Sequence, residues 1–341
     1  MNAGLMLARI LAEPAQAEGL NAAQWQILIA AARALSLFGT LSERCAGLSV
    51  PDGVAHILAD GCDLAAAGHR QAQWEAQCAR SALSGYAGKV VLMKGTAYLA
   101  AGLSPRHGRS IGDLDIMVSR QDLPEVEEKL LAAGWEWVKP DPYDDQYYRQ
   151  WMHELPPLIH RERDRMIDVH HTILPLTARP RPDAAAMLSD AVPLDNGLYV
   201  FAPEDMICHA VAHLIADGDL AGGMRNIWDI HCLIGDFAGK DGAFWSRLAA
   251  RARHHGLADQ TARALRLAHA LYGTNVDAIV AGRARASDRL FLRCVTAVDG
   301  WGRQTRPFTR KGFYVRSHLL RMPPAQLARH LWTKWRKGHR G

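Results

Sequence analysis

Asp113 and Asp115 are separated by a single residue in a short, largely apolar segment, residues 110–119. Side chains alternate between the two faces of a β-strand, so both carboxylates would point to one face, and Leu114 and Ile116 to the other. Two carboxylates held this close on an apolar strand repel each other unless a cation lies between them. A divalent metal ion commonly supplies that charge, so this segment predicts a strand that carries a metal site.

A third carboxylate, Asp168, lies in residues 166–171, which alternate as a strand should. If this strand pairs with the first, Asp113, Asp115 and Asp168 can together hold two divalent ions about 4 Å apart, the arrangement used for in-line displacement at phosphorus. Mg²⁺ binds oxygen ligands and phosphates rather than His or Cys cages. We therefore expect two Mg²⁺ (or Mn²⁺) ions.

The chain as a whole predicts an α+β fold, in which a small mixed β-sheet with flanking helices is extended by N- and C-terminal helical regions. Apolar residues recur at helical spacing through residues 1–86. Residues 87–202 hold the expected strands, residues 203–300 are again helical, and residues 301–341 form a tail.

Proline-containing segments give two local predictions. Residues 51–53, Pro-Asp-Gly, are expected to break the helical pattern, with a further helix from about residue 63 to residue 83. Residues 139–163 are polar, aromatic and rich in proline, which indicates a hairpin or loop.

The tail carries the positive charge of the chain. Residues 301–341 hold eleven Lys or Arg and no Asp or Glu, so the rest of the chain has 29 basic against 35 acidic residues. Trp332 and Trp335 flank Lys334 there, which suits an interface. Three interpretations stay open for the tail: a solvated helical end, a segment that binds an anionic membrane surface, or a nucleic-acid contact.

Cysteine usage and the N-terminus indicate a compartment. The six cysteines are scattered without a CxxC pair, which argues against a zinc cluster and a disulfide framework. No apolar run approaches the length needed to span a bilayer, and the N-terminus reads as an amphipathic helix rather than a signal peptide. A cytoplasmic location is expected, peripheral to the membrane if the tail binds lipid.

Several motifs, in order, resemble one family. The string KGTA, an Arg, GDLDIMV, a helix ending in AAGW, then IDVHH, APEDMICHAVAHL and RNIWDIHCLI, is similar to the uncharacterised nucleotidyltransferase family. That family belongs to the minimal-nucleotidyltransferase, or DNA polymerase β-like, superfamily. The resemblance covers roughly residues 70–235. It implies transfer of an NMP from an NTP, expected to be ATP, to a hydroxyl acceptor that the sequence does not identify.

The resemblance also implies roles for individual residues. Asp113, Asp115 and Asp168 would be the metal-binding and catalytic carboxylates. The superfamily normally has a Gly-Ser pair that holds the triphosphate, and here the sequence is Lys94-Gly95-Thr96. Thr96, backbone amides or Lys94 would replace the missing serine, and Lys94 is equally able to extend into solvent.

Arg109 precedes the metal-binding strand and is expected to meet phosphate oxygens, which suit its planar guanidinium. His170 shares a strand face with the third carboxylate, so a contact with metal-bound water or substrate is open.

Two histidines one turn apart, His209 and His213, allow another interpretation. Histidines at this spacing bind metal in some hydrolases. The preferred interpretation is a buried polar network of His213, Arg225 and Asp229 that joins two helices, with Arg225 still able to reach the nucleotide.

Alternatives to catalysis also stay open. Paired aspartates on a strand occur in calcium sites and as solvated edge residues. A family member that kept the fold and lost catalysis would be a nucleotide-binding or scaffold protein, docked through its basic tail.

Overall fold

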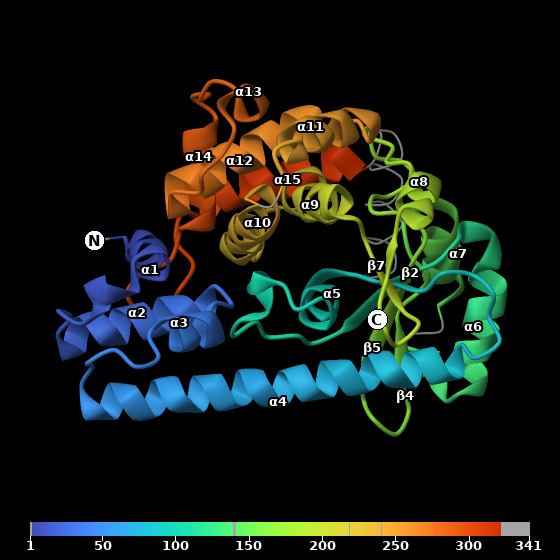
Figure 1. Ribbon diagram of the computed structural model, residues 1–341, viewed down its shortest axis with the longest axis horizontal. Coiled ribbons are helices and arrows are strands. Elements are labelled where there is room, and N and C mark those ends of the chain that lie inside the picture. The colour runs from blue at the N-terminus through green and yellow to red at the C-terminus, as the bar shows by residue number, and fades with distance from the viewer. Residues whose placement is uncertain (1, 139–140, 218, 240, 322–341) are drawn as a thin grey trace, which may run out of the picture.

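The computed structural model describes residues 2–138, 141–217, 219–239 and 241–321. Helices surround one β-sheet, and the long helix α4 (Asp52–Ala82) runs along one side of the molecule (Figure 1). The prediction of an α+β fold with a mixed sheet and flanking helices is confirmed. One cluster of buried hydrophobic residues extends from Met6 to Phe313, through all the predicted regions, so their behaviour as separate domains stays a prediction.

Among the described residues, seven short strands form one mixed sheet with the order β3-β4-β5-β2-β1-β7-β6. The pairs β2–β5 and β1–β7 are parallel and the other neighbours are antiparallel. The strands are β1 (Val91–Leu92), β2 (Leu114–Met117), β3 (Trp135–Trp137), β4 (Leu158–His160), β5 (Met166–His170), β6 (Val192–Pro193) and β7 (Tyr199–Val200). Two of the strands expected from sequence, β1 and β2, are shorter than predicted.

The N-terminal region is helical, as expected. It contains α1 (Ala3–Ala12), the 3₁₀ turn η1 (Pro14–Ala17), α2 (Ala22–Ala34), α3 (Phe38–Arg44) and α4. Asn21 and Gln24 cap α2 reciprocally, each side chain accepting a hydrogen bond from the other residue's backbone N–H.

The helical pattern is broken up to Pro51, but the break does not include residues 52–53, because α4 begins at Asp52 rather than near residue 63 as predicted. Proline and an acidic residue favour the start of a helix: the missing N–H of Pro51 costs no hydrogen bond there, and the carboxylate of Asp52 interacts well with the helix dipole.

The sheet region carries shorter helices between its strands. They are α5 (Lys94–Ala100), η2 (Ser104–Arg106), η3 (Arg120–Asp122), α6 (Leu123–Ala132), α7 (Pro142–Trp151) and α8 (Ala184–Ser189). The helix α7 occupies residues 142–151 of the segment predicted to be a hairpin or loop, so the prediction is wrong there, whereas residues 158–163 contain β4 and the start of the turn that leads into its antiparallel partner β5. Pro142 stands at the first position of the helix, where proline is tolerated, and does not interrupt it.

The C-terminal helices cover the other side of the molecule (Figure 1). They are α9 (Pro203–Val211), the π-helical turn η4 (Ala212–Asp217), α10 (Gly223–Ala238), α11 (Phe244–His254), α12 (Ala258–Tyr272), α13 (Ala278–Ala281), α14 (Asp288–Val295) and α15 (Pro307–Arg321). Contacts of α10 with η2 and α12 place this layer directly over the loop that precedes β2.

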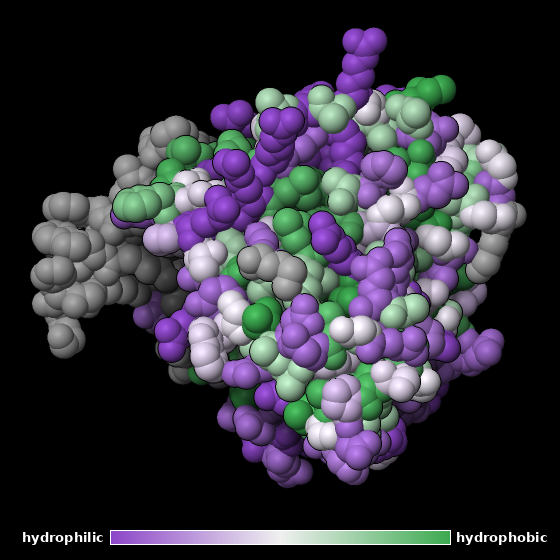
Figure 2. Space-filling model, turned by 90° about the vertical axis from the view of Figure 1, so that its left-hand side faces the viewer, coloured by the Kyte–Doolittle hydropathy of each residue, from purple (hydrophilic) through white to green (hydrophobic). Residues whose placement is uncertain are grey.

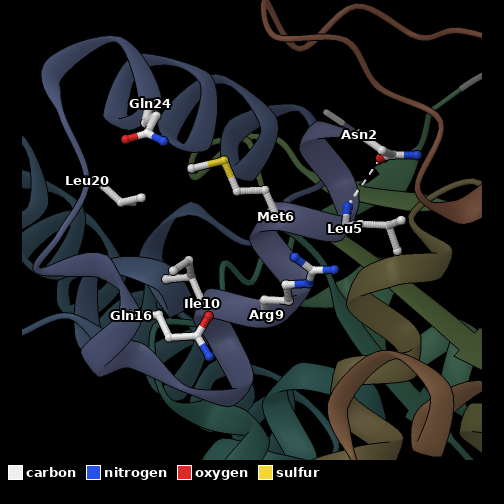
Figure 3. Close-up of a pocket in the computed structure, with 8 residues that line it drawn as sticks. All are labelled: Asn2, Leu5, Met6, Arg9, Ile10, Gln16, Leu20 and Gln24. Carbon is white, nitrogen blue, oxygen red and sulfur yellow. Dashed lines mark hydrogen bonds between the residues drawn. The ribbon is translucent and has the colours of Figure 1, made fainter.

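The surface offers a first comparison of candidate sites. The side that carries α1, α2 and α3 mixes hydrophilic and hydrophobic side chains (Figure 2). A pocket between α1 and α2 is lined mainly by uncharged side chains (Figure 3): Asn2, Leu5, Met6, Arg9, Ile10, Gln16, Leu20 and Gln24. It contains no carboxylate and shares no residue with the predicted metal site. No helix in the described part of the chain is both long and apolar enough to cross a membrane.

Candidate metal and nucleotide site

The pairing of β2 with β5 brings the predicted carboxylates together. The two strands are parallel, and their register sets Asp115 directly opposite Asp168. Leu114 and Ile116 are buried on the opposite face of β2, which fixes the orientation of the strand. One oxygen from each of Asp113, Asp115 and Asp168 lies within 4.8 Å of the others. This is the geometry that the sequence prediction required, and the catalytic role of the three residues stays a prediction.

The cluster has the electrostatics of a cation site. Burial, together with the charges of Asp115 and Glu154, raises the pKa of Asp168 to about 7. Its Oδ1 atom is buried and accepts no hydrogen bond from the part of the chain that the structure describes. A buried carboxylate oxygen without a donor is costly, and a hard divalent cation satisfies it. The three carboxylates therefore fit Mg²⁺ by donor type and by their unsatisfied charge.

Asp115 already has two cationic or polar partners. Lys94 Nζ lies 2.6 Å from its Oδ1 atom, and His170 Nε2 lies 2.9 Å from the same atom. Although burial acts in the opposite direction, Lys94 and His170 hold the pKa of Asp115 well below its usual range. The alternative in which Lys94 extends into solvent is therefore wrong, because its ammonium group pairs with the buried carboxylate.

Lys94 reaches Asp115 through an unusual backbone. Its φ angle is +49°, in the left-handed region that non-glycine residues rarely adopt. The residue is the first of α5, separated from β1 by Met93 alone. Such strain costs on the order of 1 kcal/mol and is often found at functional sites.

Gly95 is needed for space. A Cβ atom built on Gly95 would lie 2.7 Å from Arg109 Nε and 3.0 Å from Ile111 Cγ1. The side chain of Arg109 thus occupies the space that a side chain at this position would need. The next residue, Thr96, is buried in the first turn of α5.

The side chain of Arg109 is held by contacts within the protein. Its Nη1 atom donates to Asp229 Oδ2 at 2.5 Å, and its guanidinium lies 5.5 Å from the ring centroid of Tyr98. A phosphate contact would require Arg109 to leave or share Asp229. Sequence reasoning missed this pairing, because Asp229 lies 120 residues away on α10.

Arg225 and Asp229 of the predicted network form a pair within α10, and the part of His213 in that network stays a prediction. Arg225 Nη1 lies 3.5 Å from Asp229 Oδ1, while its other nitrogens donate to Ser36 O and Thr40 Oγ1. Arg225 is almost fully buried, and burial lowers its pKa to about 10. These bonds tie α10 to the N-terminal helices, which gives Arg225 a structural role.

The two histidines that stand one turn apart in the sequence lie on adjoining helical elements. His209 lies on α9 and His213 on η4. Burial, followed by the charge of Lys94, lowers the pKa of His213 to about 4, and the same causes lower that of His209. Because both are held neutral, they are not a source of positive charge for a phosphate.

His153 and Glu154 were missed by the sequence prediction. Glu154 Oε2 lies 3.3 Å from His170 Nδ1, and Glu154 forms an antiparallel bridge with His170 at the end of β5. The signal in the sequence was a His-Glu pair between Trp151 and the Pro156-Pro157 pair, which is too weak to single out. The tail residues Trp332, Lys334 and Trp335 lie outside the described residues.

One family model matches the chain. Its description is "Uncharacterised nucleotidyltransferase", and it matches residues 21–273, well over half of the chain. The chain belongs to the uncharacterised nucleotidyltransferase family. The family match is wider than the resemblance expected over residues 70–235, and it includes α2 to α4 and α10 to α12. Neither the curated proteins nor the solved structures include a match to it.

Membership supports a transferase that acts on nucleotides in general. The acidic cluster of this nucleotidyltransferase is a group that can hold a metal ion. The cluster lies within the matched residues: Asp115 is on β2, Asp113 directly precedes that strand, and Asp168 is on β5. The identity of the nucleotide, the acceptor and the ions belongs to the proposal below.

Proposed function

We propose that this family member transfers an NMP from an NTP, with ATP as the first candidate, to a hydroxyl acceptor, with release of pyrophosphate. The observation that carries the proposal is the convergence of Asp113, Asp115 and Asp168 within 4.8 Å, on paired strands of a nucleotidyltransferase-family chain. The reaction forms a bond from the hydroxyl oxygen to the α-phosphorus and breaks the bond from that phosphorus to the leaving pyrophosphate oxygen.

The three carboxylates would hold two Mg²⁺ ions. When bound, such ions neutralise charge on the triphosphate and stabilise the attacking and leaving oxygens of an in-line displacement. In this proposal Asp168 also orients the acceptor hydroxyl and takes its proton. Its partly exposed side chain, beside the more exposed Asp113, is consistent with access for an acceptor.

Lys94 is the residue best suited to the triphosphate. It is the ammonium group nearest the carboxylates, and it would pass from Asp115 to phosphate oxygens when the nucleotide enters. Gly95 and Arg109 support this arrangement, since the guanidinium packs against Gly95 and is held by Asp229. Thr96 completes the proposed nucleotide-binding segment.

The test is Mg²⁺-dependent release of pyrophosphate by the full-length protein, with each of four NTPs and a panel of hydroxyl acceptors that includes sugars, RNA and proteins. We expect release with at least one pair of substrates, and its loss in Asp113→Ala and Asp168→Ala. The matched control is Asp122→Ala, because Asp122 lies outside the cluster and accepts a hydrogen bond from Tyr86.

The second candidate is a nucleotide-binding or scaffold protein without catalysis. The specific observation in its favour is the 2.6 Å ion pair of Lys94 and Asp115, which occupies one oxygen of a proposed metal ligand. Calorimetric binding of NTP without turnover on any acceptor, and unchanged by Asp168→Ala, would support this candidate against the transferase.

For the basic tail, residues 301–341, we propose contact with an anionic surface, either a membrane or a nucleic acid. Phe308 is 89% exposed on α15, close to Arg310 and Lys311, which is a mixed apolar and basic composition. Liposome sedimentation and RNA gel shifts, with the full chain, with a chain that lacks residues 320–341 and with Phe308→Ser, separate the two partners. If the truncated and the substituted proteins both bind liposomes and RNA as tightly as the full chain does, the proposal is contradicted.

A further inference from the structure

A second group of metal-ligating side chains lies beside the carboxylate cluster. His153, Glu154 and His170 each offer one ligand atom, and these three atoms lie within 4.8 Å of one another. Two imidazoles and a carboxylate are a donor set that differs from the all-oxygen set of Mg²⁺. The group therefore calls for its own explanation.

The backbone holds these residues in place. His171 N donates to His153 O and Leu155 N donates to Val169 O, both at 2.9 Å, so the segment before β4 pairs with the end of β5. Glu154 and His170 form an antiparallel bridge within this pairing. The imidazole rings of His153 and His170 are stacked, with their centroids 5.3 Å apart. Because both segments are tied at the backbone, the three side chains are preorganised.

The donor spacing suits a tetrahedral ion. His170 Nδ1 lies 3.3 Å from Glu154 Oε2, and His153 Nε2 lies 3.7 Å from the same oxygen. Ligands at 2.0–2.1 Å from a tetrahedral Zn²⁺ lie roughly 3.3 Å from one another. These two distances are therefore close to what such an ion imposes.

An unsatisfied nitrogen points into the group. His170 is 2% exposed, and its buried Nδ1 atom lies 3.3 Å from Glu154 Oε2 but makes no hydrogen bond among the described residues. Its other nitrogen, Nε2, is engaged by Asp115 Oδ1. With the proton on Nε2, the lone pair of Nδ1 is directed at Glu154 and His153. A carboxylate that fixes the tautomer of a metal-binding histidine is a common outer contact.

We propose that His153, Glu154 and His170 form a site for one divalent transition-metal ion of the zinc class, separate from the proposed Mg²⁺ site. The ion would have three protein ligands and an open fourth position. His170 links the two sites, because the imidazole that binds the ion also donates to Asp115. Binding of the ion would thus fix the orientation of Asp115. This metal site does not depend on whether the protein catalyses the proposed transfer reaction.

The experiment uses the tag-free, full-length chain, stripped of metal and titrated with Co²⁺ in excess Mg²⁺. We expect one Co²⁺ per chain, with the strong visible absorption of a four-coordinate site, and loss of that absorption when Zn²⁺ is added. His153→Gln and Glu154→Gln should each weaken Co²⁺ binding at least tenfold. Circular dichroism in the presence of a chelator checks that each variant folds without metal. One folded variant is enough for the test.

Two controls locate the ion. His107→Gln alters another His–Glu pair, in which His107 Nδ1 lies 3.1 Å from Glu43 without a third ligand, and should leave Co²⁺ binding unchanged. Asp113→Asn alters the carboxylate cluster and should also leave it unchanged. The proposal is overturned if Co²⁺ does not bind, if binding survives both His153→Gln and Glu154→Gln, or if it is lost in Asp113→Asn.

Discussion

At the scale of single residues, the carboxylate cluster is under electrostatic strain in the metal-free protein. The pKa of Asp168 is raised to about 7 by burial and by neighbouring carboxylates. For an acid with a raised folded-state pKa, the associated stability is fully present below the unfolded pKa, about 4, and is lost as the pH rises through about 7. The metal-free protein therefore carries an unfavourable charge at pH 8.

Asp168→Asn should relieve this strain. We expect the free energy of unfolding of the metal-free protein at pH 8 to rise by on the order of 1 kcal/mol, because the amide carries no charge. The same substitution should abolish the increase in Tm that Mg²⁺ gives the wild type. Denaturant unfolding and thermal scans, with and without Mg²⁺, measure both effects.

Asp113→Asn is the matched control, since Asp113 belongs to the same cluster and is exposed. Its effect on the metal-free protein should be smaller, within about 0.5 kcal/mol. A lower stability of metal-free Asp168→Asn at pH 8 would contradict the account of charge crowding.

Lys94 should contribute to stability as well as to nucleotide binding. Lys94→Met leaves the carboxylate of Asp115 buried without its ammonium partner, so we expect a loss of about 3 kcal/mol in the metal-free protein. The affinity for NTP should also fall at least tenfold. Chemical denaturation and calorimetry measure the two effects.

Lys89→Met serves as the control for Lys94→Met. The ammonium group of Lys89 donates to two backbone carbonyls, Leu188 O at 2.9 Å and Ser189 O at 2.7 Å. No buried carboxylate is left behind, so its loss should stay near 1 kcal/mol. Equal losses of unfolding free energy in the two variants would contradict the assignment of Lys94 as the partner of a buried charge.

At the scale of elements, α5 and the loop before β2 are fitted to each other at Gly95. Gly95→Ala places a methyl group 2.7 Å from Arg109 Nε, so the guanidinium must shift away from Asp229. We expect a loss of roughly 1–3 kcal/mol by thermal unfolding. In Gly112→Ala the new methyl group meets nothing within 4 Å, and stability should change by less than about 0.5 kcal/mol. Similar changes in both would refute the steric account.

The elements that hold the site were predictable from local pattern. The alternation of Asp113 and Asp115 with Leu114 and Ile116 indicated both the strand and its polar face. Asp168 was found in the same way. Their adjacency in the sheet came from motif order, because alternation alone does not say which strands pair.

Other features depend on contacts that sequence spacing does not contain. The ion pair of Lys94 with Asp115 requires the left-handed backbone of Lys94, which favours glycine and has no sequence signal at lysine. The partner of Arg109 is 120 residues away. The helix α7 was missed because its proline and polar residues resemble a loop, although proline is favoured at a first helical position.

At the scale of the whole molecule, several buried histidines are held neutral. The pKa of His231 is lowered to about 4 by burial, and then by Arg44, and His171 and His213 have similarly lowered values. For a group with a lowered folded-state pKa, stability is present above the unfolded value, about 6.5, and is lost as the pH falls toward about 4. These histidines should therefore lower the free energy of unfolding as the pH falls from 7 to 4, a contribution opposite in sign to that of Asp168.

His231→Gln should remove the contribution of His231 to the loss of unfolding free energy at low pH. His231 bonds Thr274 Oγ1 at 2.8 Å and contacts the rings of Trp228 and Tyr272, far from any proposed metal ligand in the sequence. Between pH 7 and pH 5 the variant should lose on the order of 1 kcal/mol less than the wild type. Urea unfolding at both pH values measures the difference, and an unchanged pH dependence would contradict the assignment.

The length of α4 has a consequence for how the protein is made. Its 31 residues extend about 46 Å, past α3 at one end and under the sheet at the other (Figure 1). Buried Glu75, in its second half, pairs with Arg163, which the ribosome adds 88 residues later. A nascent chain thus exposes half of this helix, with an unpaired carboxylate, until most of the sheet exists. Ribosome-bound chains ending near residue 100 should be cut by protease within α4, and chains ending near residue 220 should resist; equal protection would refute this order of assembly.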